Sequence, residues 1–195
     1  MKTLALLIFL VGGAIAMADG NLLKNGDFSS GINHWEGDCH TIDGTTFDSA
    51  ITPPTTGVIV KLHGSDWAQV TQDFDGKIGE YLLTINYTVS PDLKFSDHAD
   101  DYVNVPGKLG YSRLKPFDSK PGDWALIIND LGAMHYNYWN IAPKPNASGP
   151  QTLTAHVQLD SDDAVKKGFY LVFPPGEGFI NLLNITLAPL TANPQ

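Results

Sequence analysis

Apolar and polar residues alternate with a period of two through much of the chain between Val58 and Leu187. In residues 81–88, large apolar side chains occupy every second position, and threonine or asparagine occupies most positions between them. Because successive side chains of a β-strand point to opposite faces, this alternation predicts strands with one buried and one solvated face. No amphipathic helix of useful length interrupts the pattern, so we expect an all-β protein.

Three further segments extend this pattern. Residues 152–159 alternate in the same way, residues 169–173 carry apolar side chains up to a Pro-Pro-Gly turn, and residues 180–187 form the last candidate strand. With 19 glycines, 13 prolines and 17% charged residues, the composition suits short strands joined by turns. We therefore predict an antiparallel β-sandwich, in which two sheets bury their apolar faces against each other.

The length of 195 residues suits one domain with a single sizeable core. We predict this domain over residues 19–190, followed by a flexible tail at 191–195. An inserted loop at about residues 91–122 breaks the alternation, because it is rich in proline and glycine and carries an acidic cluster. Connections of this length in compact domains are commonly functional. Whether this loop lines a site or covers a sheet edge stays open.

The first eighteen residues have the form of a signal peptide. Lys2 precedes an apolar run that ends in Ala16-Met17-Ala18, which indicates cleavage before Asp19. The run is about 15 residues long, whereas a membrane-spanning helix needs roughly 20. We therefore expect a secreted, extracellular protein without a membrane span, or a periplasmic or cell-surface protein if the source is bacterial.

Charge and cysteine content exclude several classes of protein. The 21 acidic residues outnumber the 12 basic ones and give a net charge of −9, which argues against nucleic acid as a partner. The single cysteine, Cys39, rules out a disulfide framework and any multi-cysteine metal site. Glycosylation sequons begin at Asn86, Asn146 and Asn184. Their use depends on whether the source is bacterial or eukaryotic, which the sequence leaves open.

Three islands of sequence carry a resemblance to a known family. In the first island, residues 21–29 read NLLKNGDFS and are followed by Trp35. The middle island has two parts, WAQVTQ at residues 67–72 and GEYLLT at residues 79–84, and the last island reads FINLLNITL at residues 179–187. In this order the islands resemble carbohydrate-binding modules of the galactose-binding-like jelly-roll type. The resemblance implies a jelly-roll sandwich, a first strand in the N-terminal island and a tryptophan that plugs one end of the core.

The resemblance also implies a structural calcium ion. Such modules often hold Ca²⁺ with a carboxylate just after the first phenylalanine and an aspartate in the last strand, and those positions are Ser29 and Asn184 here. Affinity for Ca²⁺ falls as carboxylate ligands are lost. One structural calcium ion therefore stays open, with Asp27 and Asn184 as the side chains expected to contribute.

A glycan site needs aromatic rings that stack on the apolar faces of sugars and amide groups that bond their hydroxyls. Residues 134–140 read MHYNYWN and have this composition, although neighbouring residues of a strand face opposite ways and about half must enter the core. The predicted ligand-binding residues are the aromatic side chains of Trp124, Tyr136, Tyr138 and Trp139, and the polar side chains of Asn86, Asn129, His156 and Gln158.

No catalytic motif is present, and we assign no catalytic residues. The three glutamates, Glu36, Glu80 and Glu177, do not form a recognisable acid–base pair. The leading hypothesis is a secreted, non-catalytic, lectin-like protein that binds a polysaccharide or other glycan. An extracellular structural or adhesion protein with a protein partner or envelope contacts is the first alternative, since one fold hosts both uses. A small jelly-roll polysaccharide lyase or hydrolase is the second.

Overall fold

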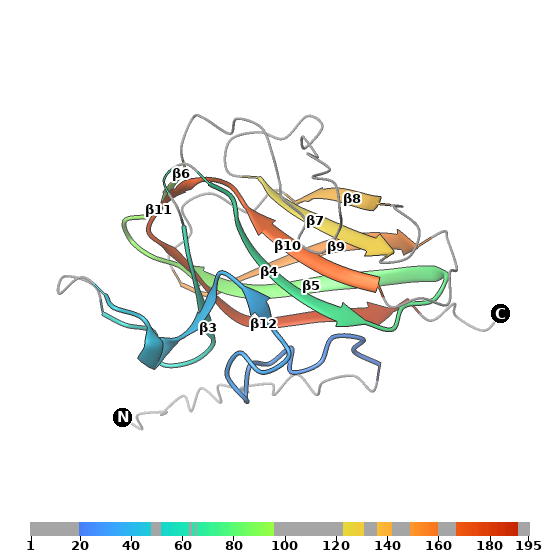
Figure 1. The fold of residues 1–195 in the computed structure, drawn as a ribbon, viewed down its shortest axis with the longest axis horizontal. Coiled ribbons are helices and arrows are strands. Elements are labelled where there is room, and N and C mark those ends of the chain that lie inside the picture. The colour runs from blue at the N-terminus through green and yellow to red at the C-terminus, as the bar shows by residue number, and fades with distance from the viewer. Residues whose placement is uncertain are drawn as a thin grey trace, which may run out of the picture.

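The computed structural model describes a β-sandwich whose two layers of strands lie face to face (Figure 1). The described residues are 20–47, 52–62, 64, 66–95, 123–130, 136–141, 149–159 and 167–190, and for 129–130 and 136–141 this covers the backbone alone. The predicted signal peptide at 1–18, most of the predicted inserted loop and the tail at 191–195 lie outside these residues.

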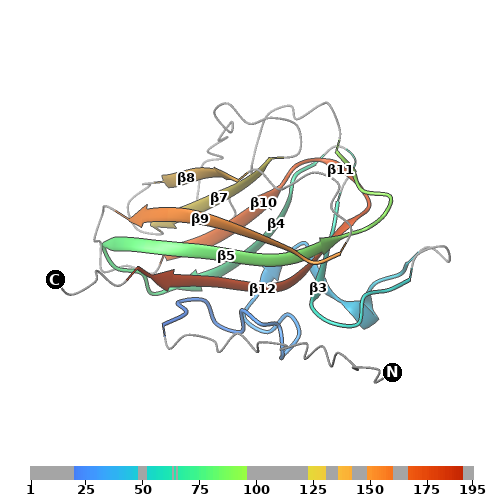
Figure 2. The same ribbon diagram turned by 180° about the vertical axis from the view of Figure 1, so that it is seen from behind.

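Each layer is a five-stranded antiparallel sheet (Figures 1 and 2). The first sheet has the order β1 (Glu36–Gly37), β4 (Ala68–Phe74), β10 (Lys167–Phe173), β7 (Trp124–Asp130) and β8 (Tyr136–Ile141). The second sheet has the order β2 (Cys39–Thr41), β3 (Val58–Lys61), β12 (Phe179–Pro189), β5 (Gly79–Val89) and β9 (Gln151–Leu159). A small ribbon pairs β6 (Lys94–Phe95) with β11 (Gly176–Glu177), and a 3-10 turn covers Ile42–Gly44.

Among the described strands, the chain changes sheet between β1 and β2, β3 and β4, β4 and β5, β5 and β7, β8 and β9, β9 and β10, and β10 and β12. These crossings make the antiparallel sandwich a jelly roll, as the resemblance implied. In β5 the four alternate apolar residues from Tyr81 to Tyr87 are buried, as the period-two pattern requires. In the described part of the chain, no helix has the length and apolar character needed to cross a bilayer.

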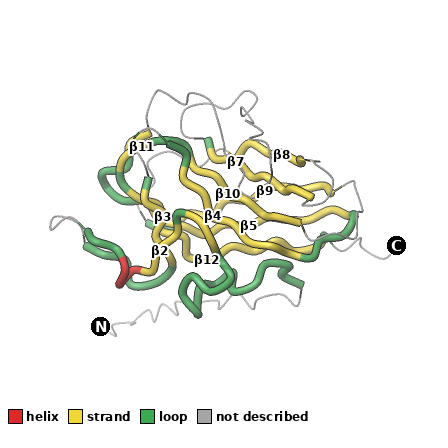
Figure 3. The backbone as a smooth tube through the Cα atoms, viewed as in Figure 1, coloured by secondary structure: helices red, strands yellow, loops and turns green. Residues whose placement is uncertain are grey.

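The N-terminal island folds as turns rather than as the strand that the resemblance implied. Figure 3 shows it as loop, and it lies along the half of β12 that extends beyond the pairing with β3. The Asn21 carboxamide oxygen accepts a bond from Leu187 N at 2.9 Å, and the Gly26 carbonyl accepts one from Ile185 N at 2.7 Å. Backbone groups that a strand would have paired are therefore satisfied by a turn and a side chain.

Trp35 has the structural role that the resemblance implied. It is buried, its ring centroid lies 5.3 Å from that of Phe28 and 6.0 Å from that of Phe169, and its indole N–H donates to the Asn25 carbonyl at 3.0 Å. The N-terminal turns thus insert one large aromatic pair into the sandwich core. Burial of each ring stabilises the folded state by about 2–3 kcal/mol.

Candidate functional site

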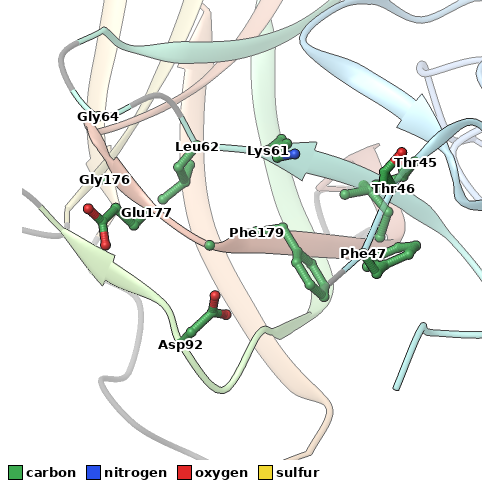
Figure 4. Close-up of a pocket in the computed structure, with 12 residues that line it drawn as sticks. Thr45, Thr46, Phe47, Lys61, Leu62, Gly64, Asp92, Gly176, Glu177 and Phe179 are labelled. Atoms are coloured by element: carbon green, nitrogen blue, oxygen red, sulfur yellow. The ribbon is translucent and has the colours of Figure 1, made fainter. Parts of the chain in front are cut away.

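A cavity of about 420 Å³ opens at one end of the sandwich (Figure 4). It lies where the chain leaves the 3-10 turn, where β3 ends, where β5 turns into β6, and where β11 leads into β12. We call this cavity the end pocket. Its lining residues that carry aromatic or charged side chains are Phe47, Lys61, Asp92, Glu177 and Phe179.

Two phenylalanines form the aromatic wall of the end pocket. The rings of Phe47 and Phe179 meet edge to face, with centroids 5.3 Å apart and planes at 75°. Phe179 is 9% exposed and starts β12, while Phe47 is half-buried and precedes β3. An edge-to-face pair of this kind is a favourable aromatic contact, so each ring holds the other in place.

The backbone around Phe179 fixes the rim of the end pocket. Ser90 N donates to the Phe179 carbonyl at 3.0 Å, and Phe179 N donates to the Ser90 hydroxyl at 3.0 Å. Gly178 has φ +90°, and a Cβ there would lie 2.6 Å from the Ser90 hydroxyl oxygen. Glycine is therefore required for this close approach. The two segments that carry Asp92 and Glu177 are held together by these contacts.

The acidic and basic side chains of the end pocket lie on different sides of it. Asp92 and Glu177 lie on one side of the pocket, and Lys61 lies on the other side, nearer Thr45 and Thr46 (Figure 4). All three charged side chains are exposed, and none has an ion-pair or hydrogen-bond partner among the described residues. Their hydrogen-bonding groups are therefore available to a ligand.

A second apolar cluster lies on the outer face of the first sheet. Ala125, Ile127, Tyr170 and Val172 form an apolar cluster that is separate from the core, and Trp67 packs against it. We call these five residues the outer-face cluster. Its four central members are at most 5% exposed. Strands β7 and β10 are consequently apolar on both faces, which the uninterrupted apolar runs at 125–128 and 169–173 signal in the sequence.

Two buried polar atoms lie beside the outer-face cluster. The indole nitrogen of Trp67 and the carboxamide oxygen of Gln69 are buried, and neither makes a hydrogen bond within the described part of the chain. An unpaired buried donor or acceptor costs about 1–3 kcal/mol. Tyr170 lies close above Gly168, because a Cβ at that glycine would be 2.6 Å from a carbon of the tyrosine ring.

The structure corrects the prediction for Trp124. This side chain is fully buried between the sheets, where its ring centroid lies 4.7 Å from that of Tyr87 and 4.9 Å from that of Phe173. The register of β7 turns Trp124 toward the core, so it lies outside any surface that a sugar could stack on. The rest of the aromatic prediction, Tyr136, Tyr138 and Trp139, falls on β8, whose side chains lie outside the structure's description.

The predicted polar residues are divided between the two sheets. Asn86, His156 and Gln158 belong to β5 and β9 of the second sheet, whereas Asn129 belongs to β7 of the first sheet, and its side chain is not described. The Asn86 carboxamide oxygen accepts a bond from the Thr152 hydroxyl at 2.7 Å. His156 Nε2 lies 3.5 Å from a carboxylate oxygen of Glu80, and both side chains are exposed. These residues do not form one site with the end pocket.

The predicted calcium ligands lie on neighbouring segments. The bond between Gly26 and Ile185 joins the turn that carries Asp27 to the part of β12 that carries Asn184. Asp27 is exposed and its Oδ1 accepts bonds from the amide and hydroxyl of Ser29 at 3.2 and 3.0 Å. Within the described ranges, no three histidine, cysteine, aspartate or glutamate side chains group together as a metal site. These two side chains alone supply fewer oxygens than Ca²⁺ requires, and calcium binding stays a prediction.

Cys39 is a buried thiol. Burial raises the pKa of the Cys39 thiol to about 11, and the neighbouring Asp38 carboxylate acts in the same direction. A thiol with this pKa is protonated at neutral pH and is a poor nucleophile. Cys39 is therefore a packing residue.

No family model matches this sequence, and no curated protein matches it. Among solved structures, the chain is similar to the second family 16 carbohydrate-binding module, with a TM-score of 0.51 and 12% identity over 86% of this chain and 99% of the other. It is also similar to the CBM22-2 xylan-binding domain of Paenibacillus barcinonensis Xyn10C, with a TM-score of 0.51 and 7% identity over 84% of this chain and 97% of the other.

A third solved structure, TmCBM61 in complex with β-1,4-galactotriose, aligns with a TM-score of 0.49 and 12% identity over 87% of this chain and 98% of the other. At these identities the likeness concerns the fold alone. The chain has the jelly-roll β-sandwich fold of carbohydrate-binding modules, and the resemblance seen in the sequence is confirmed at that level.

Proposed function

We propose that this protein is a secreted, non-catalytic glycan-binding protein, and that the end pocket is its ligand site. The observation that supports the proposal best is the edge-to-face pair of Phe47 and Phe179 beside charged groups that have no partner among the described residues. A sugar ring has an apolar C–H face and a rim of hydroxyls, so it needs this combination of surfaces. The cavity volume falls within the range of about 300–1,000 Å³ that is usual for small-ligand sites.

The proposed binding mode follows from the positions of these groups. The C–H face of one sugar unit packs on the exposed part of Phe47, and Phe179 supports that ring from behind. Hydroxyls of the sugar bond to Thr45, Thr46 and the charged side chains around the opening (Figure 4). Because the Ser90–Phe179 contacts already fix the rim, little ordering is required on binding.

Affinity electrophoresis through gels that contain different soluble polysaccharides tests the proposal. We expect one class of polysaccharide to retard the protein and the Phe47→Ala variant to migrate freely, because the variant lacks the stacking ring. The matched control is Ile78→Ala, which removes an exposed apolar side chain from the turn between β4 and β5. Thermal unfolding of both variants shows whether they keep the native fold.

The same protein sample distinguishes glycan binding from the two alternative functions. Absence of retardation on a broad panel would contradict the proposal and favour a structural or adhesion role with a protein partner. Release of reducing ends from a polysaccharide would establish an enzyme instead. Retardation that persists in Phe47→Ala would place the glycan outside the end pocket.

A further inference from the structure

We infer that the end pocket selects glycans that carry a protonated primary amine, such as polymers of glucosamine. This inference rests on the proposed function of the pocket and names the class of its ligand. It follows from the placement of two carboxylates, Asp92 and Glu177, on one side of a cavity that has an aromatic wall.

The two carboxylates are positioned by backbone contacts rather than by ion pairs. Asp92 follows Ser90 by two residues and Glu177 precedes Phe179 by two, so the reciprocal Ser90–Phe179 bonds keep both acidic residues at the rim. Neither carboxylate has a partner among the described residues. An ammonium group offers three donors, and hydrogen bonds between ionised groups are about twice as strong as neutral ones.

Two lysines lie near these carboxylates and have to be considered. Lys94 is the register partner of Glu177 in the β6–β11 ribbon, yet no ion pair joins them. Lys61 occupies the opposite side of the pocket, nearer Thr45 and Thr46 (Figure 4). A ligand amine that approaches Asp92 therefore stays away from Lys61, which is placed to donate to a hydroxyl of the same ligand.

The charge of the whole chain acts in the same direction. With a net charge of −9, the protein attracts cationic polymers and repels acidic polysaccharides. Neutral glycans gain nothing from this field. The local carboxylates and the overall charge thus favour an amine-bearing glycan over acetylated or acidic ones.

Calorimetric titration with matched oligosaccharides tests the inference. Glucosamine oligomers and N-acetylglucosamine oligomers of equal length differ in the acetyl group and hence in charge, and they are compared at pH 5.5, both with and without EDTA. We expect the glucosamine oligomers to bind roughly tenfold more tightly or better, because each carboxylate contact is charge-assisted. The preference should shrink as salt is added.

Variants of the rim locate the effect. We expect Asp92→Asn combined with Glu177→Gln to weaken binding of the glucosamine oligomer far more than binding of the acetylated oligomer, and so to lose the preference for the amine. The control is Asp75→Asn, which makes the same change of charge at an exposed position on the turn between β4 and β5. Because all these side chains are exposed, the variants should fold.

The outcomes distinguish this inference from the proposed function. Equal affinity for both oligomers, unchanged in the double variant, would overturn the amine preference and leave glycan binding intact. Binding of glucosamine oligomers that disappears with EDTA would show that a divalent cation bridges the contact, and this also overturns the inference. Failure of every oligosaccharide to bind would overturn both proposals.

Discussion

Asn25 and Gly26 shape the turns of the N-terminal island. Asn25 has φ +50°, its amide group donates to the Gly31 and Asn33 carbonyls at 2.9 and 2.8 Å, and its carboxamide oxygen accepts from Ser30 N at 3.0 Å. Asparagine tolerates the left-handed region and closes turns with its own side chain. Gly26 leaves room for the Ile185 carbonyl, against which any Cβ would clash.

Gly26→Ala tests this packing. The added methyl group meets the Ile185 carbonyl, so the turn has to move away from β12. We expect the free energy of unfolding to fall by about 3 kcal/mol, within the range for overpacking with strain. Urea denaturation measures this value. Gly64→Ala is the control, since a Cβ there meets nothing within 4 Å; equal stability of the two variants would contradict the prediction.

The buried Cys39 thiol makes stability depend on pH in alkaline solution. The pKa is about 11 in the folded protein against 9.0 for an unperturbed thiol, so the unfolded state releases its proton first as the pH rises. The Cys39 contribution to the free energy of unfolding is therefore complete below pH 9 and declines between pH 9 and 11. Urea denaturation across this range should show the decline in the wild type and a smaller one in Cys39→Ala. Equal slopes would show that Cys39 does not cause it.

At the scale of elements, β10 is the strand on which the first sheet depends. It lies between β4 and β7, and all seven of its residues are buried. Its inner residues face the core, whereas Tyr170 and Val172 enter the outer-face cluster. A central strand with two apolar faces is unusual in an antiparallel sheet, where one face is commonly solvated.

Gly168→Ala tests the contact between Tyr170 and the strand. The new Cβ would lie 2.6 Å from the ring, so the ring has to shift. We expect a loss of about 1–3 kcal/mol in the free energy of unfolding. A double-mutant cycle with Tyr170→Leu measures the coupling, because the smaller side chain should remove the conflict. Additive effects of the two substitutions would contradict the prediction.

At the scale of the whole molecule, the order of strands in the second sheet creates the end pocket. The residues that line it are far apart in the sequence, from Thr45 to Phe179. They meet because β3, β5 and β12 are neighbours in the second sheet. No local pattern marks Phe47, Asp92 or Phe179 as parts of one site. The sequence prediction instead favoured residues 134–140, because their composition alone has the character of a glycan site.

The prediction that Trp124 binds a glycan was wrong for a physical reason. Whether an aromatic residue of a strand stacks on a ligand or fills the core depends on the strand's register, and a shift of one residue reverses the answer. The structure gives the β7 register, with Trp124 and Leu126 facing the core and Ala125 and Ile127 facing outward. The sequence contained no signal that could have fixed this register.

The sequence by itself determined the all-β class and the faces of β5 and β9, because both depend on a period-two alternation of apolar and polar residues. It also excluded a disulfide framework, because it contains a single cysteine. Only the tertiary structure decided which aromatic rings are exposed, and which distant side chains surround the end pocket. These properties depend on strand register and on the order of strands in the sheets, which are set by contacts between residues far apart in the chain.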